Sequence, residues 1–296
     1  MIKKAGPLWE AVAADRLMQH TLKGVTDMLR SMYSGISGMR NFQTKLDVIG
    51  NNISNVNTAG FKKGRTTFSD MVSQQIAGAS GPVVNGRGGT NPRQVGLGSQ
   101  LATIDTIHTQ GSLQNTNRSL DLGISGNGYF RLSDSETGGT TYYSRAGNFY
   151  LDEDGYIVNA NGLYLLDDSD PGSRIQIAPD SQSFSIGQAG VVNVIDSAGQ
   201  LTSPGTISLA YFSNPEGLQK EGDNLYQVTD NSGAAQRTTP TNDGTGALVA
   251  GTLEMSNVDL SEEFTEMIVA QRGFQANTRI ITTSDEILQE LVNLKR

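Results

Sequence analysis

The sequence predicts an α+β protein in which paired N- and C-terminal heptad helices, of coiled-coil type, surround a central all-β antiparallel domain. Apolar residues recur every seven positions near both ends of the chain, and this spacing is typical of helices that pack along one seam. Between the ends, short apolar runs are separated by turn sequences, which is the pattern of a β meander, barrel or sandwich.

The N-terminal helix is expected to begin at Met28 and to end near Val56. Its apolar residues form one seven-residue row and a second row offset by three: Met32, Met39, Leu46 and Ile53, and Phe42, Ile49 and Val56. Three internal glycines each cost about 1 kcal/mol relative to alanine, so the isolated helix is expected to be weak. Gly60 is a stop signal, because glycine adopts the left-handed conformation after a helix without strain.

The C-terminal helix carries a matching row and two further apolar residues: Leu260, Met267, Phe274, Ile281 and Leu288, with Phe264 and Leu291. Ser261 is its expected N-cap, and the acidic residues that follow suit the positive end of the helix dipole. The apolar rows of both helices are the candidate subunit-assembly site. From the residues alone, packing between subunits and packing within the helical hairpin of one monomer are both open.

The middle of the chain is expected to form short strands, because alternating residues are bounded there by turn sequences. The hairpin signals Asp154-Gly155 and Asn161-Gly162 are the strongest of these turns. The expected strands lie at 120–124, 129–132, 142–151, 156–158, 163–166, 174–178, 184–186, 191–195 and 206–212.

Composition shifts divide the chain into regions. These are an N-terminal helical assembly domain (28–77), a Gly/Pro-rich linker (78–98), a central β domain (99–252) and a C-terminal helical assembly domain (253–296) that packs with residues 28–60. Within the first region, residues 66–76 are expected to be either a short helix or an extended continuation.

Residues 1–27 do not share the pattern of the rest. No heptad row extends into them, and charged residues interrupt every apolar run, so they make a poor secretory signal. The codons of Lys23-Gly24-Val25 can spell a ribosome-binding sequence at a normal distance before Met28. We therefore expect Met28 to be the natural start and 1–27 to be a leader or a mis-assigned gene start; a real N-terminal arm is the alternative.

Charge and composition exclude several classes of protein. The net charge is −8 and the pI is about 4.8, which argues against nucleic-acid binding and against an anionic membrane surface. No apolar run is long enough to span a bilayer. Cysteine is absent, so disulfides, thiolate metal sites and cysteine nucleophiles are excluded.

The motifs that could carry chemistry are weak. Residues 86–89 are glycine-rich but lack the Gly-Lys-Ser/Thr of a phosphate loop, and 152–155 lack the ligand spacing of a calcium loop. His108 has an Asp and a Ser nearby in sequence, which is not sufficient for a catalytic triad. The aspartates of 167–170 are better explained as a solvated loop than as a metal cluster. We expect no enzyme activity, no cofactor and no metal.

Three stretches resemble the bacterial flagellar rod and hook family. Residues 51–62 read Asn-Asn-Ile-Ser-Asn-Val-Asn-Thr-Ala-Gly-Phe-Lys and resemble its N-terminal signature, while 119–130 and 258–294 resemble its central and C-terminal motifs. The opening at 28–35 also fits the start of that family, so the resemblance covers essentially all of 28–296. Within the family, the compact hook protein of Gram-positive bacteria is the nearer resemblance and the distal rod protein is the alternative.

The resemblance implies a self-assembling tube that bends while transmitting motor torque to the filament. Its implied partners are further copies of itself in a helical homopolymer, the distal rod protein, the hook cap and hook–filament junction proteins, and the flagellar type III export apparatus. It implies an extracellular location reached without a cleaved signal peptide. An extracellular enzyme or glycan-binding module on a helical stalk is the competing class. We also expect residues 28–56 and 260–294 to become ordered only in the polymer.

Overall fold

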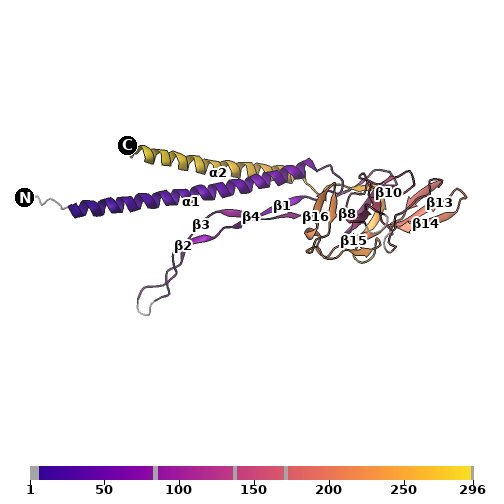
Figure 1. Ribbon diagram of the computed structural model, residues 1–296, viewed down its shortest axis with the longest axis horizontal. Helices are drawn as coiled ribbons and strands as arrows, with labels where there is room; N and C mark the ends of the chain where they lie inside the picture. The colour runs from indigo at the N-terminus through magenta and orange to yellow at the C-terminus, as the bar shows by residue number, and fades with distance from the viewer. Residues whose placement is uncertain (1–6, 83–85, 136–138, 170–172, 295–296) are drawn as a thin grey trace, which may run out of the picture. The chain divides into compact units, whose positions relative to one another are not determined.

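The computed structural model describes residues 7–82, 86–135, 139–169 and 173–294, with no side chains described for 7–28, 291 and 294. The chain folds into two compact units. One, here called the helical unit, comprises 1–49, 66–104 and 264–296; the other, the β unit, comprises 50–65 and 105–263. The α+β class predicted from the sequence is confirmed, since two long helices flank a β-rich middle (Figure 1).

The two helices are α1, Pro7–Ser54, and α2, Leu260–Leu294. In the helical unit they lie side by side and antiparallel, since Gly38 lies against Asn277 and Gly273 lies against Phe42 (Figure 1). Helix α1 thus begins well before Met28. The assignment of 1–27 as a leader stays a prediction, because residues 1–6 and the side chains before Leu29 lie outside the described part.

The helix ends differ from the expected ones by a few residues. Helix α1 stops at Ser54, and Gly60 follows with a φ of +72°, as the sequence predicts for a left-handed glycine. A Cβ on Gly60 would lie 2.5 Å from the backbone nitrogen of Ala146, so only glycine fits. The N-cap of α2 is Asp259 and not Ser261: its Oδ1 accepts the backbone N–H of Ser261 at 2.8 Å.

The helical unit also contains two antiparallel strand pairs. Strand β1, Gly64–Asp70, pairs with β4, Ser99–Thr106, and strand β2, Ser73–Ala77, pairs with β3, Arg93–Gly96. An isolated bridge between Ser80 and Thr90 continues the second pair. The helical alternative for 66–76 is therefore wrong, and the expected linker 78–98 contains strand β3. We call residues 71–82 and 86–98 the hairpin arm.

The β unit has a main sheet built from strands that are mostly adjacent in sequence. Its strands are β7 (Tyr129–Ser133), β8 (Thr141–Ser144), β9 (Tyr150–Leu151), β10 (Ile157–Val158), β11 (Tyr164–Leu165), β15 (Leu209–Tyr211), β16 (Gln219–Gly222), β17 (Leu225–Gln227) and β18 (Gln236–Thr238). Among the described residues their order is β16-β17-β8-β7-β11-β10-β9, with β15 pairing with β7 and β18. Phe130 lies opposite Ser144 in the β7–β8 register.

Smaller sheets and a short 3₁₀ helix complete the β unit. They consist of β5 (Leu113–Asn115) with β20 (Thr252–Glu254), β6 (Leu122–Ser125) with β19 (Ala247–Ala250), and β12 (Ser183–Ile186), β13 (Val191–Ile195) and β14 (Leu201–Thr206); the 3₁₀ helix is η1 (Pro215–Gly217). The core of the β unit gathers apolar side chains from the main sheet and the smaller sheets. Its members from the main sheet include Phe130, Leu132, Leu165 and Leu209, none of which is exposed.

Most expected strands are present, but two differ. The expected strand 142–151 is divided into β8 and β9, because the chain leaves the sheet at Gly147, whose carbonyl accepts the N–H of Leu122 at 2.9 Å. Residues 174–178 form only isolated bridges, among them Gln176 with Tyr156.

We expect Gly155→Ala to lower the free energy of unfolding of the β unit more than Gly162→Ala does. Both glycines lie in hairpin turns with φ near +80°, so alanine at either position carries about 1–2 kcal/mol of left-handed strain. Only at Gly155 would the added Cβ overlap another group, the carbonyl oxygen of Ile177. Urea unfolding of the two variants measures the difference, and equal losses would contradict it.

Candidate assembly site

The inner side of α2 carries the predicted heptad row and a second row that has no apolar signature. Met267, Phe274, Ile281 and Leu288 are half-buried. The companion row, three residues after each of the first three, consists of the buried Ala270, the half-buried Asn277 and the buried Ser284. These residues alternate at spacings of three and four, so they form one continuous seam. Sequence reasoning missed the companion row because its residues are small or polar.

Glycines allow α1 and α2 to approach closely. A Cβ on Gly38 would lie 2.8 Å from Nδ2 of Asn277, and one on Gly273 would lie 2.5 Å from Cζ of Phe42. An ion pair between Lys45 and Glu266 lies on the same pair of helices. Gly38 weakens α1 and Gly273 weakens α2, but each makes room for the partner helix. The apolar rows of the two helices thus pack, at least partly, within one chain.

On α1, the predicted residues lie in several environments. Ile49 is buried, while Met32, Met39, Phe42 and Leu46 are half-buried. Phe42 also faces Phe68 of β1, with 6.5 Å between the ring centroids, so the strand pair covers part of the helix.

The predicted residues at the unit boundary and at the C-terminus differ from the rest of the rows. Ile53 and Val56 are half-buried in the β unit, and Leu260, in the same unit, is exposed. Phe264 is also exposed, and the side chain of Leu291 lies outside the described part.

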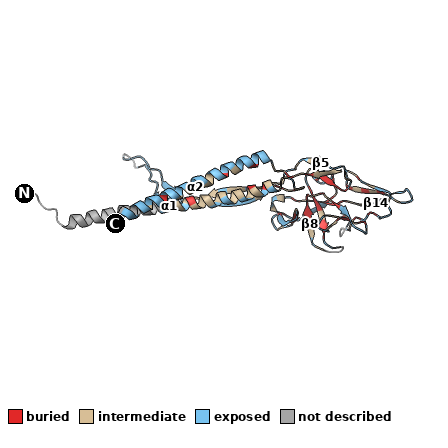
Figure 2. Cartoon of the chain, turned by 90° about the horizontal axis from the view of Figure 1, so that it is seen from above, coloured by how far each residue is buried: buried red, intermediate tan, exposed pale blue. Residues whose placement is uncertain are grey.

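A second apolar surface on α2 is unpacked. Val269, Ile280 and Ile287 are 55, 42 and 48% exposed. At about 100° per residue they share one side of the helix, next to the inner seam. We call these three residues the outer face. Figure 2 shows that most of α2 is exposed, whereas buried residues gather in the strands of the β unit.

The hairpin arm and the end of β4 add further exposed apolar side chains to the helical unit. Val72, Ile76, Val95 and Ile104 are all exposed, and none of the residues of β2 and β3 is even half-buried. A two-stranded ribbon without a packed face is marginally stable on its own. Such a ribbon is typical of a segment that packs against another molecule.

The β unit holds a buried ion cluster that joins segments far apart in sequence. Lys62, Arg145 and Glu254 have side chains only 1, 4 and 1% exposed. Nζ of Lys62 donates to Oε1 of Glu254 at 2.6 Å, and Nε of Arg145 lies 2.9 Å from Oε2 of Glu254. The backbone N–H of Gly111 donates to the same carboxylate at 2.9 Å. Burial of Lys62, only partly offset by Glu254, lowers the pKa of its ammonium.

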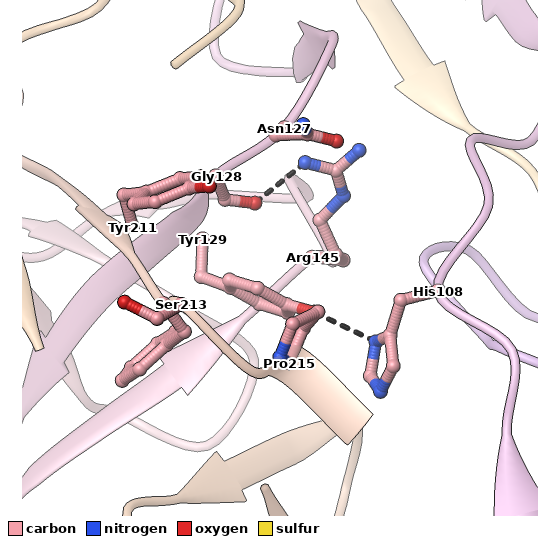
Figure 3. A pocket seen from close by; sticks show the side chains of 9 residues that line it. His108, Asn127, Gly128, Tyr129, Arg145, Tyr211, Ser213 and Pro215 are labelled. Carbon is pink, nitrogen blue, oxygen red and sulfur yellow. Dashed lines mark hydrogen bonds between the residues drawn. The ribbon is translucent and has the colours of Figure 1, made fainter. Parts of the chain in front are cut away.

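A cavity of about 250 Å³ lies beside this cluster (Figure 3). His108, Tyr129 and Arg145 line it, and the hydroxyl of Tyr129 shares a hydrogen bond of 2.7 Å with Nδ1 of His108. Nη1 and Nη2 of Arg145 donate to the carbonyls of Gly128 and Gly126. The hydrogen-bond partner of Nδ1 of His108 is thus the hydroxyl of Tyr129, whereas a triad pairs its histidine with a serine and a carboxylate. Among the described residues no cluster of His, Asp and Glu suited to a metal ion occurs.

We expect the stability of the β unit to fall as the pH drops from about 6.5 to about 4. Burial, together with the cations Lys62, Lys220 and Arg145, lowers the pKa of His108 from 6.5 to about 4. In this range His108 is protonated in the unfolded chain but neutral in the folded chain, so the free energy of unfolding falls by up to about 3 kcal/mol. In His108→Asn, which retains an acceptor for Tyr129, the free energy of unfolding measured with urea should depend less on pH across this range. An unchanged slope would contradict the assignment.

Comparisons with known proteins agree with the layout of helices and β unit. Family models match three parts of the chain: "Flagella basal body rod protein" at 32–62, "Flagellar hook protein FlgE/F/G D1 domain" at 123–194 and "Flagellar basal body rod FlgEFG protein C-terminal" at 249–294. No helix in the described part is long and apolar enough to cross a membrane.

Relatives of two kinds match along most of the chain. The flagellar basal-body rod protein FlgG of Bacillus subtilis (strain 168) is 60% identical over 272 residues, covering 91% of this chain and 100% of that protein. The FlgG of Borreliella burgdorferi is 38% identical, with 91 and 100% covered. The flagellar hook protein FlgE of the same organism is 33% identical over 445 residues, with 90 and 100% covered. The chain therefore belongs to the flagellar rod and hook family and is a structural component of the bacterial flagellum.

Proposed function

We propose that this protein is the distal rod subunit of the flagellar basal body. The observation that carries the proposal is the 60% identity to a rod protein along its whole length, against 33% to a hook protein. The preference for the hook that the sequence motifs suggested is therefore reversed. The shared terminal and central motifs occur in both branches of the family, whereas identity along the whole chain favours the rod branch.

The subunit assembles through its helical unit. Within one chain, α1 and α2 pack along the inner seam, and the outer face is left for a neighbouring copy. Each isoleucine or valine buried in that contact contributes about 1.5–3 kcal/mol. The hairpin arm provides a second contact, since the side chains of Val72 and Ile76 are 81 and 60% exposed. In this proposal the predicted half-buried rows hold the helix pair together, whereas the exposed outer face and hairpin arm, which the sequence did not predict, join it to the polymer.

The β unit is the outer part of the polymer in this proposal. Its core is complete within one chain, so it contributes a folded body and not an interface made of open strands. Its partners are further copies of the chain and, at the distal end, the hook. The subunit reaches the outside of the cell through the flagellar type III apparatus without a cleaved signal. The roles of the hook cap and hook–filament junction proteins apply only to the hook alternative.

The test is complementation in Bacillus subtilis. The chain, started at Met28, is expressed in one strain that lacks its own rod protein FlgG and in another that lacks its hook protein. The rod proposal expects swimming to return only in the first strain. Swimming restored only in the hook-deficient strain would overturn it. Electron microscopy of the purified protein after salting out adds a direct readout, since either branch of the family should form tubes.

A further inference from the structure

Asn52 ties the two helix ends together inside the β unit. It lies in the last turn of α1 and its side chain is buried. Its Nδ2 donates to Oε2 of Glu263 at 3.2 Å and to the carbonyl of Gly64 at 2.9 Å, and its Oδ1 accepts the N–H of Gly64 at 2.9 Å. Glu263 is itself buried, in the first turn of α2. One amide thereby satisfies three groups on two other segments, the carboxylate of Glu263 and both backbone groups of Gly64.

The β unit holds both of these helix ends. Nδ2 of Asn257 donates to the carbonyl of Ile107 at 2.8 Å, and its Oδ1 accepts the N–H of Lys63 at 2.8 Å. The N–H of Gly60 donates to the carbonyl of Glu254 at 2.8 Å. Hydrogen bonds within the β unit therefore fix the chain at Gly60 and Lys63, after α1, and at Asn257, before α2.

The boundary between the compact units falls at the same place. The β unit includes α1 only from Gly50 onward and α2 only as far as Glu263. Beyond these points the two helices contact each other along the inner seam, where Lys45 pairs with Glu266, and they carry glycines and exposed apolar residues. Starting a helix is its most unfavourable step, disfavoured by on the order of a thousandfold, whereas each added residue is nearly neutral. A first turn that is already held removes that barrier.

We propose that Asn52 and Glu263 form a preformed nucleus from which both terminal helices extend when the subunit joins the polymer. The β unit keeps 50–56 and 259–263 ordered in the free subunit, while 28–49 and 264–294 become helical on assembly. The nucleus also sets the two helices side by side, so that their seams meet in register. The sequence-based expectation is disorder of 28–56 and 260–294 in the free subunit. The nucleus restricts that disorder to 28–49 and 264–294. It holds equally for a rod or a hook subunit.

Hydrogen exchange by mass spectrometry on the full-chain monomer tests the nucleus. Amides of 53–56 and 262–263 should exchange at least about a hundredfold more slowly than those of 30–45, because the former are held and the latter are not. In Asn52→Ala this protection should fall by about tenfold or more, the loss expected when buried partners are left unsatisfied. Alanine is the better helix former, so intrinsic propensity alone predicts the opposite change. Asn51→Ala, on the exposed side of the same turn, is the matched control and should keep its protection.

A second pair of variants tests the other half of the contact. Glu263→Gln keeps an oxygen that can accept the Asn52 amide and should retain most of the protection, whereas Glu263→Ala should lose it. Strands β7 and β8 should be equally protected in every variant. The proposal is overturned if 30–45 are as protected as 53–56 in the wild-type monomer. Equal protection of 53–56 in Asn52→Ala and Asn51→Ala, or a uniform loss across the β core, would also overturn it.

Discussion

Glu254→Gln is expected to lower the free energy of unfolding of the β unit by about 3–5 kcal/mol. The substitution keeps the size of the side chain but removes the anion that pairs with two buried cations, Lys62 and Arg145. Removing one partner of a buried pair costs this much because the remaining charges lose both water and counter-charge. The amide also turns an N–H donor toward a cluster that consists of donors. Urea unfolding of the full chain at neutral pH, followed by far-UV circular dichroism, measures the loss.

The neighbouring pair of residues supplies the control. Lys63 and Glu262 form an ion pair of 2.8 Å, but the side chain of Glu262 is 58% exposed. Glu262→Gln should therefore change the free energy of unfolding by less than about 1 kcal/mol. Lys62→Met combined with Glu254→Gln should recover part of the loss, since it removes one of the two stranded cations. A loss in Glu254→Gln no larger than that in Glu262→Gln would mean that the cluster is not desolvated in solution.

This cluster illustrates why the sequence could predict the helices but not the buried polar contacts of the β unit near the helix ends. A lysine, an arginine and a glutamate are ordinary surface residues by type, and nothing in their spacing brings positions 62, 145 and 254 together. Only the fold places them in one dry site. The residues around Asn52 were noticed as part of a family motif, but the motif did not show that the amide spans both helix ends.

The heptad rows could be predicted because a seven-residue period survives in any helix that packs along a seam. The companion row of α2 could not be predicted, since Ala270, Asn277 and Ser284 do not share an apolar character. They share smallness or a hydrogen-bonding group, which suits a site where glycine of the partner helix approaches. A search for apolar residues alone therefore finds half of such a seam.

The hairpin arm escaped prediction for a related reason. Strands are recognised by alternation of buried and exposed residues, yet every residue of β2 and β3 is exposed. Glycine and proline between them favoured a linker. The hairpin is defined by backbone pairing between β2 and β3, and this pairing produces no periodic pattern of apolar residues in the sequence.

Polymerisation is expected to be abolished by Ile280→Asp combined with Ile287→Asp, with the melting of the monomeric β unit unchanged. The two isoleucines belong to the outer face and are 42 and 48% exposed, so a carboxylate at either position stays hydrated in the monomer. In a packed contact each change loses about 1.5–3 kcal/mol of burial and adds the cost of dehydrating a charge. Sedimentation and electron microscopy after salting out measure assembly, and calorimetry measures the β unit.

A matched substitution on the inner seam separates the two kinds of contact. Phe274→Asp should also block assembly, but it does so by separating α1 from α2 in the same chain, where Gly273 already lies against Phe42. Cross-linking can distinguish the routes. Because a disulfide traps even transient pairing of α1 with α2, cysteines placed at Gly38 and Asn277 should cross-link within one chain faster in the outer-face variant than in Phe274→Asp. The chain has no native cysteine, so no other thiol competes. Normal tubes from the double isoleucine variant would show that the outer face is not a subunit contact, and assembly would then have to rest on the hairpin arm.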